Sequence, residues 1–159
     1  MNNLTIRKAT PNDFEQMFTL WLEMQEFHVQ FDEKWYKPEE RCKAKAFEYW
    51  NQKLNDDNAI MLVAEKDGDL VGMIISFIIT RPPVLENQFN LLFIDNVIIS
   101  KYYRRLGIFK QMMNTLISIA KEKGVSAINL TVNYENETAI KAYESIGLRK
   151  IELGMLRYL

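Results

Sequence analysis

Apolar segments rich in β-branched residues fill the middle of the chain, and their order restricts the fold more than any other feature. Residues 60–65 and 70–80 are two such segments, and the turn Lys66-Asp67-Gly68-Asp69 between them predicts an antiparallel hairpin. A third strand is expected over 91–100, after which helices and strands alternate. The alternating elements are a helix over 108–123, a strand over 126–132, a helix over 136–146 and a last strand or broken hairpin over 148–158. This order predicts an α/β fold with a mixed central sheet.

The first third of the chain predicts one strand and two helices. Residues 4–8 alternate apolar and polar side chains, as an edge strand does. Thr10-Pro11-Asn12-Asp13 has the residues of a helix start, and it predicts a helix that runs to about Phe27. An irregular aromatic segment is expected over 28–37. Two further expectations are that Glu39 and Glu40 occupy the first turn of a helix starting at Pro38, and that Arg81-Pro82-Pro83 ends the strand over 70–80.

Composition excludes several classes of protein. A length of 159 residues predicts a single domain over 1–159, and 20 Lys and Arg against 21 Asp and Glu argue against a dedicated nucleic-acid binder. The single cysteine, Cys42, excludes an intrachain disulfide, and the single histidine, His28, excludes a multi-histidine zinc site, so no metal is expected. No apolar run approaches the roughly 20 residues of a membrane helix, and no secretory signal is expected, because residues 1–7 include no apolar run. The expected location is therefore the cytoplasm, away from membranes.

Four cations gather where the third strand gives way to the amphipathic helix, at Lys101, Arg104, Arg105 and Lys110. Unpaired backbone N–H groups at a helix start suit a phosphate, and Gly107 has no side chain to keep an anion away from them. The same residues would also serve as a solvated basic turn. Neither a nucleoside triphosphate P-loop nor a G-x-G-x-x-G dinucleotide motif is present.

Two segments resemble motifs of the GNAT superfamily of N-acetyltransferases. Arg104-Arg105-Leu106-Gly107-Ile108 resembles its Q/R-x-x-G-x-G/A acetyl-CoA loop. Asn136-x-x-Ala139-x-x-x-Tyr143-Glu144-x-x-Gly147-Leu148 resembles its N-x-x-A-x-x-x-Y-x-x-x-G-F segment. The resemblance is specific over about residues 91–149 and only topological over the first 80. Phe109 occupies a loop position where a small residue is usual, so its side chain must point into the core or alter the pyrophosphate site.

The resemblance implies a GNAT-type fold, with a mixed, mostly antiparallel central sheet and helices on both faces. It also implies acetyl-CoA as cosubstrate, with pantetheine along one strand backbone and the pyrophosphate over residues 105–110. A splayed strand edge would supply free N–H and C=O groups for the pantetheine amides. The cofactor-binding residues implied are Val97, Ile98, Ile99, Arg104, Arg105, Leu106, Gly107, Ile108, Phe109, Lys110, Asn136 and Tyr143.

Asn136 and Tyr143 are two helical turns apart and so share a face of the expected helix. Asn136 also suits the N-cap position of that helix. Tyr143 could belong to a core stripe with Ala139 and Ile146. The resemblance instead implies a catalytic role, in which the Tyr143 hydroxyl donates a proton to the departing CoA thiolate.

An attacking amine arrives as an ammonium, so a group must take its proton first. Asp95, on the expected strand over 91–100, is the candidate implied by the resemblance. It could act as a direct base, through a water relay, or only as a polar residue on the strand's outer face. Glu23, Glu26 and Glu65 are lesser candidates.

Two further features keep two interpretations each, whereas Cys42 is expected only to fill a helix position. His28 is either a surface or partly buried residue or a substrate contact. An aromatic cluster either packs as lid and core or covers a cationic amine; its members are Trp21, Phe27, Phe31, Trp35 and Tyr36.

The sequence thus predicts an acetyltransferase in which a primary amine attacks acetyl-CoA directly, with a small-molecule acceptor favoured. The alternatives are acetylation of a peptide N-terminus or lysine, and a catalytically silent CoA-binding module. Apolar strand ends and aromatic side chains also make a homodimer plausible.

Overall fold

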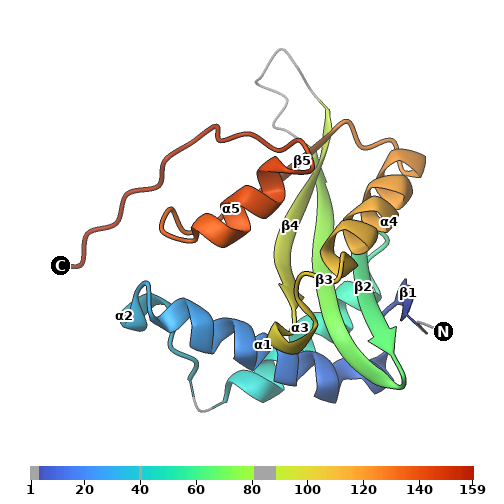
Figure 1. The fold of residues 1–159 in the computed structure, drawn as a ribbon, viewed down its shortest axis with the longest axis horizontal. Coiled ribbons are helices and arrows are strands. Elements are labelled where there is room, and N and C mark those ends of the chain that lie inside the picture. Colours follow the sequence, from blue (N-terminus) through green and yellow to red (C-terminus); the bar gives the residue numbers. More distant parts are fainter. Residues whose placement is uncertain (1–3, 40, 81–88) are drawn as a thin grey trace.

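The computed structural model describes residues 4–39, 41–80 and 89–159, and it is built on one five-stranded sheet (Figure 1). The strands lie side by side in chain order, and they are β1 (Leu4–Lys8), β2 (Ala59–Lys66), β3 (Asp69–Thr80), β4 (Asn90–Ile99) and β5 (Ala127–Leu130). The pairs from β1 to β4 are antiparallel, whereas β4 and β5 are parallel. The expected mixed, mostly antiparallel sheet is confirmed.

Helices cover both faces of this sheet. They are α1 (Phe14–Val29), α2 (Glu33–Tyr36), α3 (Cys42–Leu54), α4 (Ile108–Glu122) and α5 (Glu137–Glu144), with single 3-10 turns η1 (Pro11–Asp13) and η2 (Lys101–Tyr103). Met61 and Val63 of β2 are buried with α1 and α3, while Leu62, between them, is buried with Met112 of α4. This alternation is what a strand buried on both faces produces. None of the described helices is long and apolar enough to cross a bilayer.

A bulge in β4 changes which side chains face which core. Ile75 of β3 lies opposite Asn96, but the next residue, Ser76, lies opposite Ile94, so Asp95 is the extra residue. Before the bulge Ile94 packs on the α4 side, and after it Ile98 packs on the α1 and α3 side. A bulge of this kind redirects a side chain at the cost of one paired residue. Here it leaves Asp95 exposed.

The pairing between β4 and β5 ends halfway along β4. Residues 91–94 pair with 127–130, and no described strand pairs with the same edge of β4 over 95–99. Figure 1 shows β4 continuing past the end of β5 toward η2. Apart from the Ile99 carbonyl, to which Arg104 donates at 3.1 Å, this edge has no described strand partner, as the sequence-based expectation of a splayed edge requires.

The region between the first two long helices differs from expectation. α1 continues to Val29, and α2 forms within the segment expected to be irregular, because Asp32 caps it by accepting a hydrogen bond from the Trp35 N–H at 3.0 Å. α3 begins at Cys42 rather than at Pro38, because the residue before a proline avoids helical geometry and the chain leaves α2 extended. Glu40 and the proline pair at 82–83 lie outside the described residues.

The strand or hairpin expected over 148–158 is wrong. Residues 148–159 have no regular structure, and Figure 1 shows the segment leaving α5 and running away from the sheet. Side chains hold it at two points: Lys150 lies 3.7 Å from Glu144 of α5, and the Tyr158 hydroxyl donates to the Asp32 carboxylate at 2.9 Å. The apolar alternation that suggested a strand is present, but a strand also needs a partner edge, and among the described residues the segment has none.

Candidate active site

The loop before α4 presents its backbone outward. Arg105 has φ 62° and Gly107 has φ 75°, so two left-handed residues stand within three positions. Gly107 occupies the N-cap of α4, and a Cβ added there would meet no atom within 4 Å. Open space therefore lies in front of the helix start, where N–H groups and the helix dipole favour an anion. Arg105 and Lys110 are exposed beside it.

Glu23 of α1 fixes the other end of this loop. Its carboxylate accepts hydrogen bonds from the Lys101 N–H at 2.6 Å and the Ser100 hydroxyl at 3.1 Å. It also lies 3.6 Å from the guanidinium of Arg104, which donates to the Ile99 carbonyl. Arg104 thus contacts both α1 and β4. Glu23 holds the start of the loop in place, a role that local sequence patterns did not reveal.

Tyr143 lies against the first turn of α4. Its ring meets that of Phe109 edge-on, with centroids 5.8 Å apart, and Phe109 packs against the core on the α4 side. The Phe109 side chain therefore points into the core, so it does not enter the space in front of the loop where the pyrophosphate is expected. Burial raises the pKa of Tyr143 to about 12, so its hydroxyl is protonated at neutral pH. Asn136 caps α5 by accepting from the Ala139 N–H at 3.2 Å.

Asp95 is held by two neutral donors. The Tyr49 hydroxyl donates to its Oδ2 at 3.1 Å, and the Asn96 amide donates to the same oxygen at 2.7 Å. Burial, followed by the nearby Asp95 carboxylate, raises the pKa of Tyr49, so the phenol remains a donor. Sequence reasoning missed Tyr49, because next to Trp50 on an amphipathic helix it looks like a packing residue.

Asp95 faces a cavity of about 500 Å³ between α1, α2, α3 and β4. The lining residues that matter chemically are Trp21, Trp35, Tyr36, Lys37, Glu39, Cys42, Lys45, Tyr49, Trp50, Asp95 and Asn96. Three of the five members of the expected aromatic cluster thus line it.

The other two, Phe27 and Phe31, pack on His28 instead, with ring centroids 5.9 and 6.1 Å from it. Burial among these rings lowers the pKa of His28, which does not line the cavity. Glu65 is engaged by Arg7 at 2.7 Å, and Glu26 is exposed outside the cavity. Among the described residues no cluster of His, Cys, Asp or Glu could hold a metal ion.

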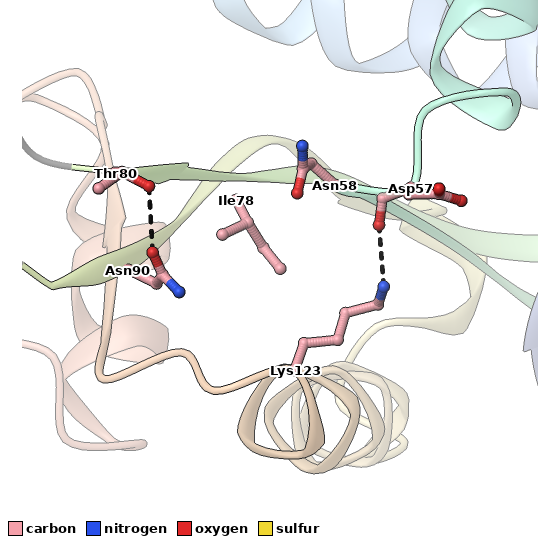
Figure 2. Close-up of a pocket in the computed structure, with 6 residues that line it drawn as sticks. All are labelled: Asp57, Asn58, Ile78, Thr80, Asn90 and Lys123. Carbon is pink, nitrogen blue, oxygen red and sulfur yellow. Dashed lines mark hydrogen bonds between the residues drawn. The ribbon is translucent and has the colours of Figure 1, made fainter.

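A second cavity, of about 430 Å³, lies at the opposite end of α4 from Gly107 (Figure 2). Lys123 extends from the end of α4 and donates to the Asp57 carbonyl at 2.8 Å, and the Thr80 hydroxyl donates to Asn90 Oδ1 at 3.1 Å. None of the residues expected to bind or react lines it. The helix start, the free edge of β4 and the Asp95 cavity therefore form the candidate site.

Comparison with known proteins agrees with this arrangement. The family model described as acetyltransferase (GNAT) family matches residues 18–148. The chain belongs to the GNAT family. Membership confirms the resemblance carried by the loop at 104–108 and the segment at 136–148.

Among curated GNAT relatives, mouse N-acetyltransferase family 8 member 3 is 27% identical over 106 residues, which cover 67% of this chain and 46% of the relative. The uncharacterized N-acetyltransferase MJ1207 of Methanocaldococcus jannaschii is 29% identical over 96% of this chain and 65% of its own length. The chain thus spans about half to two thirds of the length of these relatives.

Solved GNAT structures share the fold. The tetramutant of the BH1408 protein from Bacillus halodurans superposes with a TM-score of 0.88 at 23% identity, covering 98% of this chain and 99% of that one. Aminoglycoside N-acetyltransferase AAC(6')-Iy, solved with CoA, gives 0.80 at 16% identity, covering 100% and 96%. At these identities the likeness concerns the fold alone.

Proposed function

We propose that this GNAT chain transfers the acetyl group of acetyl-CoA to a primary amine of a small molecule. One observation carries the proposal: the open, left-handed helix start at Gly107 stands at the end of the same β4 strand whose bulge turns Asp95 into a cavity. A phosphate-binding end and a proton-accepting group are thereby fixed on one rigid strand. The concave wall of aromatic side chains that α1, α2 and α3 place around Asp95 supports a small molecule as the acceptor.

The chain's residues would hold acetyl-CoA at two places. The backbone of Val97, Ile98 and Ile99 would pair with the pantetheine amides along the free edge of β4, with Arg104 sharing the Ile99 carbonyl or releasing it. Backbone N–H groups over residues 105–110 would bind the pyrophosphate, helped by the charges of Arg105 and Lys110. Arg104 would act through the loop, because its guanidinium is bound to Glu23 and Ile99.

Two side chains would move protons. Acetyl-CoA supplies a thioester, whose carbonyl carbon forms the new bond to nitrogen while the carbon–sulfur bond breaks. Asp95 would accept the proton that the ammonium must lose before attack, directly or through a water molecule. Tyr143 would donate its hydroxyl proton to the departing sulfur, a role that its high pKa permits at neutral pH. The nitrogen would lose its second proton to solvent as the amide forms, and Tyr143 would regain a proton from solvent.

Acetyl-CoA should raise the melting temperature of the protein. Binding in the micromolar range corresponds to about 8 kcal/mol, and ligand at 100 times the dissociation constant should add about 2.7 kcal/mol to the free energy of unfolding. For a domain of this size that shift is roughly 5–10 °C. A thermal melt at millimolar acetyl-CoA and CoA measures it, with ATP as a control that lacks pantetheine. A melting temperature that neither CoA compound moves would contradict the proposed function.

A further inference from the structure

The carboxylate of Asp95 is the one charged group of the cavity that no described residue neutralises. Its hydrogen bonds come from the uncharged side chains of Tyr49 and Asn96, and no described cation forms an ion pair with it. Since Asp95 lies on the cavity wall, a cation entering the cavity would meet a partner there.

The remaining negative charge of the described lining is already paired. Glu39 forms an ion pair with Lys45, which also lines the cavity. The second lysine of the lining, Lys37, is paired with Glu33, which lies 3.1 Å away and outside the cavity. A ligand with one ammonium therefore finds one free carboxylate, whereas a second or third ammonium finds no described free acid and lies beside acids that already have lysine partners. Each further ammonium would lose water without gaining an ion-pair partner, which disfavours binding.

Aromatic side chains supply most of the remaining wall. Trp21 from α1, Trp35 and Tyr36 from α2, and Tyr49 from α3 line the cavity around Asp95, and Trp50 closes it from the core with 2% of its surface exposed. Such faces bury flat apolar groups and also attract a cation close to them. Trp35 is 62% exposed, so a bound apolar group would cover surface that water now covers.

We propose that the acceptor is a primary monoamine carried on an aromatic or other flat apolar group, and not a polycation. The inference rests on the proposed acetyl transfer and names its substrate class. It separates this chain from the structural neighbour described as an aminoglycoside N-acetyltransferase, since aminoglycosides carry several ammonium groups.

The test compares three amines with acetyl-CoA at low salt: 2-phenylethylamine, spermidine and the aminoglycoside kanamycin. The expected result is a kcat/KM for 2-phenylethylamine about ten-fold or more above that of either polycation, since one unfavourable charge contact costs roughly that factor. Equal or higher kcat/KM for a polycation would overturn the proposed acceptor class. Acetylation of none of the three would overturn it too, while the thermal shift with acetyl-CoA tests the proposed function separately.

A pair of variants on α3 sharpens this comparison. Lys45→Gln frees Glu39 inside the cavity, so the kcat/KM of spermidine relative to 2-phenylethylamine should rise about five-fold or more. Lys43→Gln, two residues away on the same helix, frees Glu15 outside the cavity and should leave the ratio unchanged. The same ratio in Lys45→Gln as in wild type, or an equal rise in both variants, would contradict the charge argument.

Discussion

Replacing Gly107 by valine should weaken acetyl-CoA binding by at least about 100-fold, or about 2.7 kcal/mol, while the protein still folds. A branched side chain there would project into the open space in front of the α4 start, between the backbone N–H groups and the pyrophosphate. It would also strain a residue with φ 75°, a conformation that costs a β-branched residue roughly 1–2 kcal/mol. Titration calorimetry measures the affinity, and circular dichroism and thermal melting measure the fold.

Gly124→Val is the matched control for this variant. Gly124 has φ 74°, also without an atom within 4 Å of an added Cβ, and it follows the opposite end of the same helix. The strain, and so the loss of stability, should be similar in both variants, but only Gly107→Val should lose acetyl-CoA binding. Wild-type affinity in Gly107→Val would mean that the phosphates bind elsewhere.

Tyr143→Phe should lower turnover strongly and leave acetyl-CoA affinity nearly unchanged. The substitution keeps the ring that packs on Phe109 and removes only the hydroxyl. Loss of a general acid typically costs about 10²- to 10⁴-fold, and we expect the lower end because a thiol of pKa about 8.5 is already a fair leaving group. Since the pKa of Tyr143 is raised to about 12, its proton is present throughout the usual assay range and should cause no alkaline loss of activity there.

Steady-state kinetics at several pH values checks this result. Tyr134→Phe is the control, since Tyr134 is 72% exposed and its hydroxyl bonds only to the neighbouring Glu135 among the described residues. Full turnover of Tyr143→Phe with an unchanged pH profile would make Tyr143 a packing residue.

Asp95→Asn should change the pH dependence of the reaction. Without this proton acceptor the amine must lose its proton to solvent, so the increase of the rate with pH should shift to higher pH.

Local patterns were sufficient for most of the fold. The hairpin of β2 and β3, the helix α4 and its start at Gly107 depend on side-chain periodicity and turn residues that are close in sequence, so they could be predicted. The segment at 148–158 has the same kind of periodicity and still forms no strand in the single chain. Periodicity specifies which face of a strand is apolar, but a partner edge decides whether the strand forms.

The site was predictable only in part, because its supporting contacts join distant residues. The loop residues and Tyr143 belong to continuous motifs, and the structure places Tyr143 at the α4 start through Phe109. The hydrogen bonds of Tyr49 to Asp95 and of Glu23 to Lys101 span 46 and 78 positions, and no spacing in the sequence reveals them. The bulge at Asp95 likewise depends on the register between β3 and β4, which only the assembled sheet fixes.

The most direct test of acetyl transfer at this site is a product assay. Wild type, Gly107→Val and Gly124→Val would each be incubated with acetyl-CoA and a panel of primary amines, with mass spectrometry for the acetylated amine and a thiol reagent for free CoA. We expect one acetylated amine for each CoA released by wild type and by Gly124→Val, and about 100-fold less product from Gly107→Val when acetyl-CoA is kept below saturation. Release of CoA without an acetylated amine, or equal product from Gly107→Val, would contradict acetyl transfer at this site.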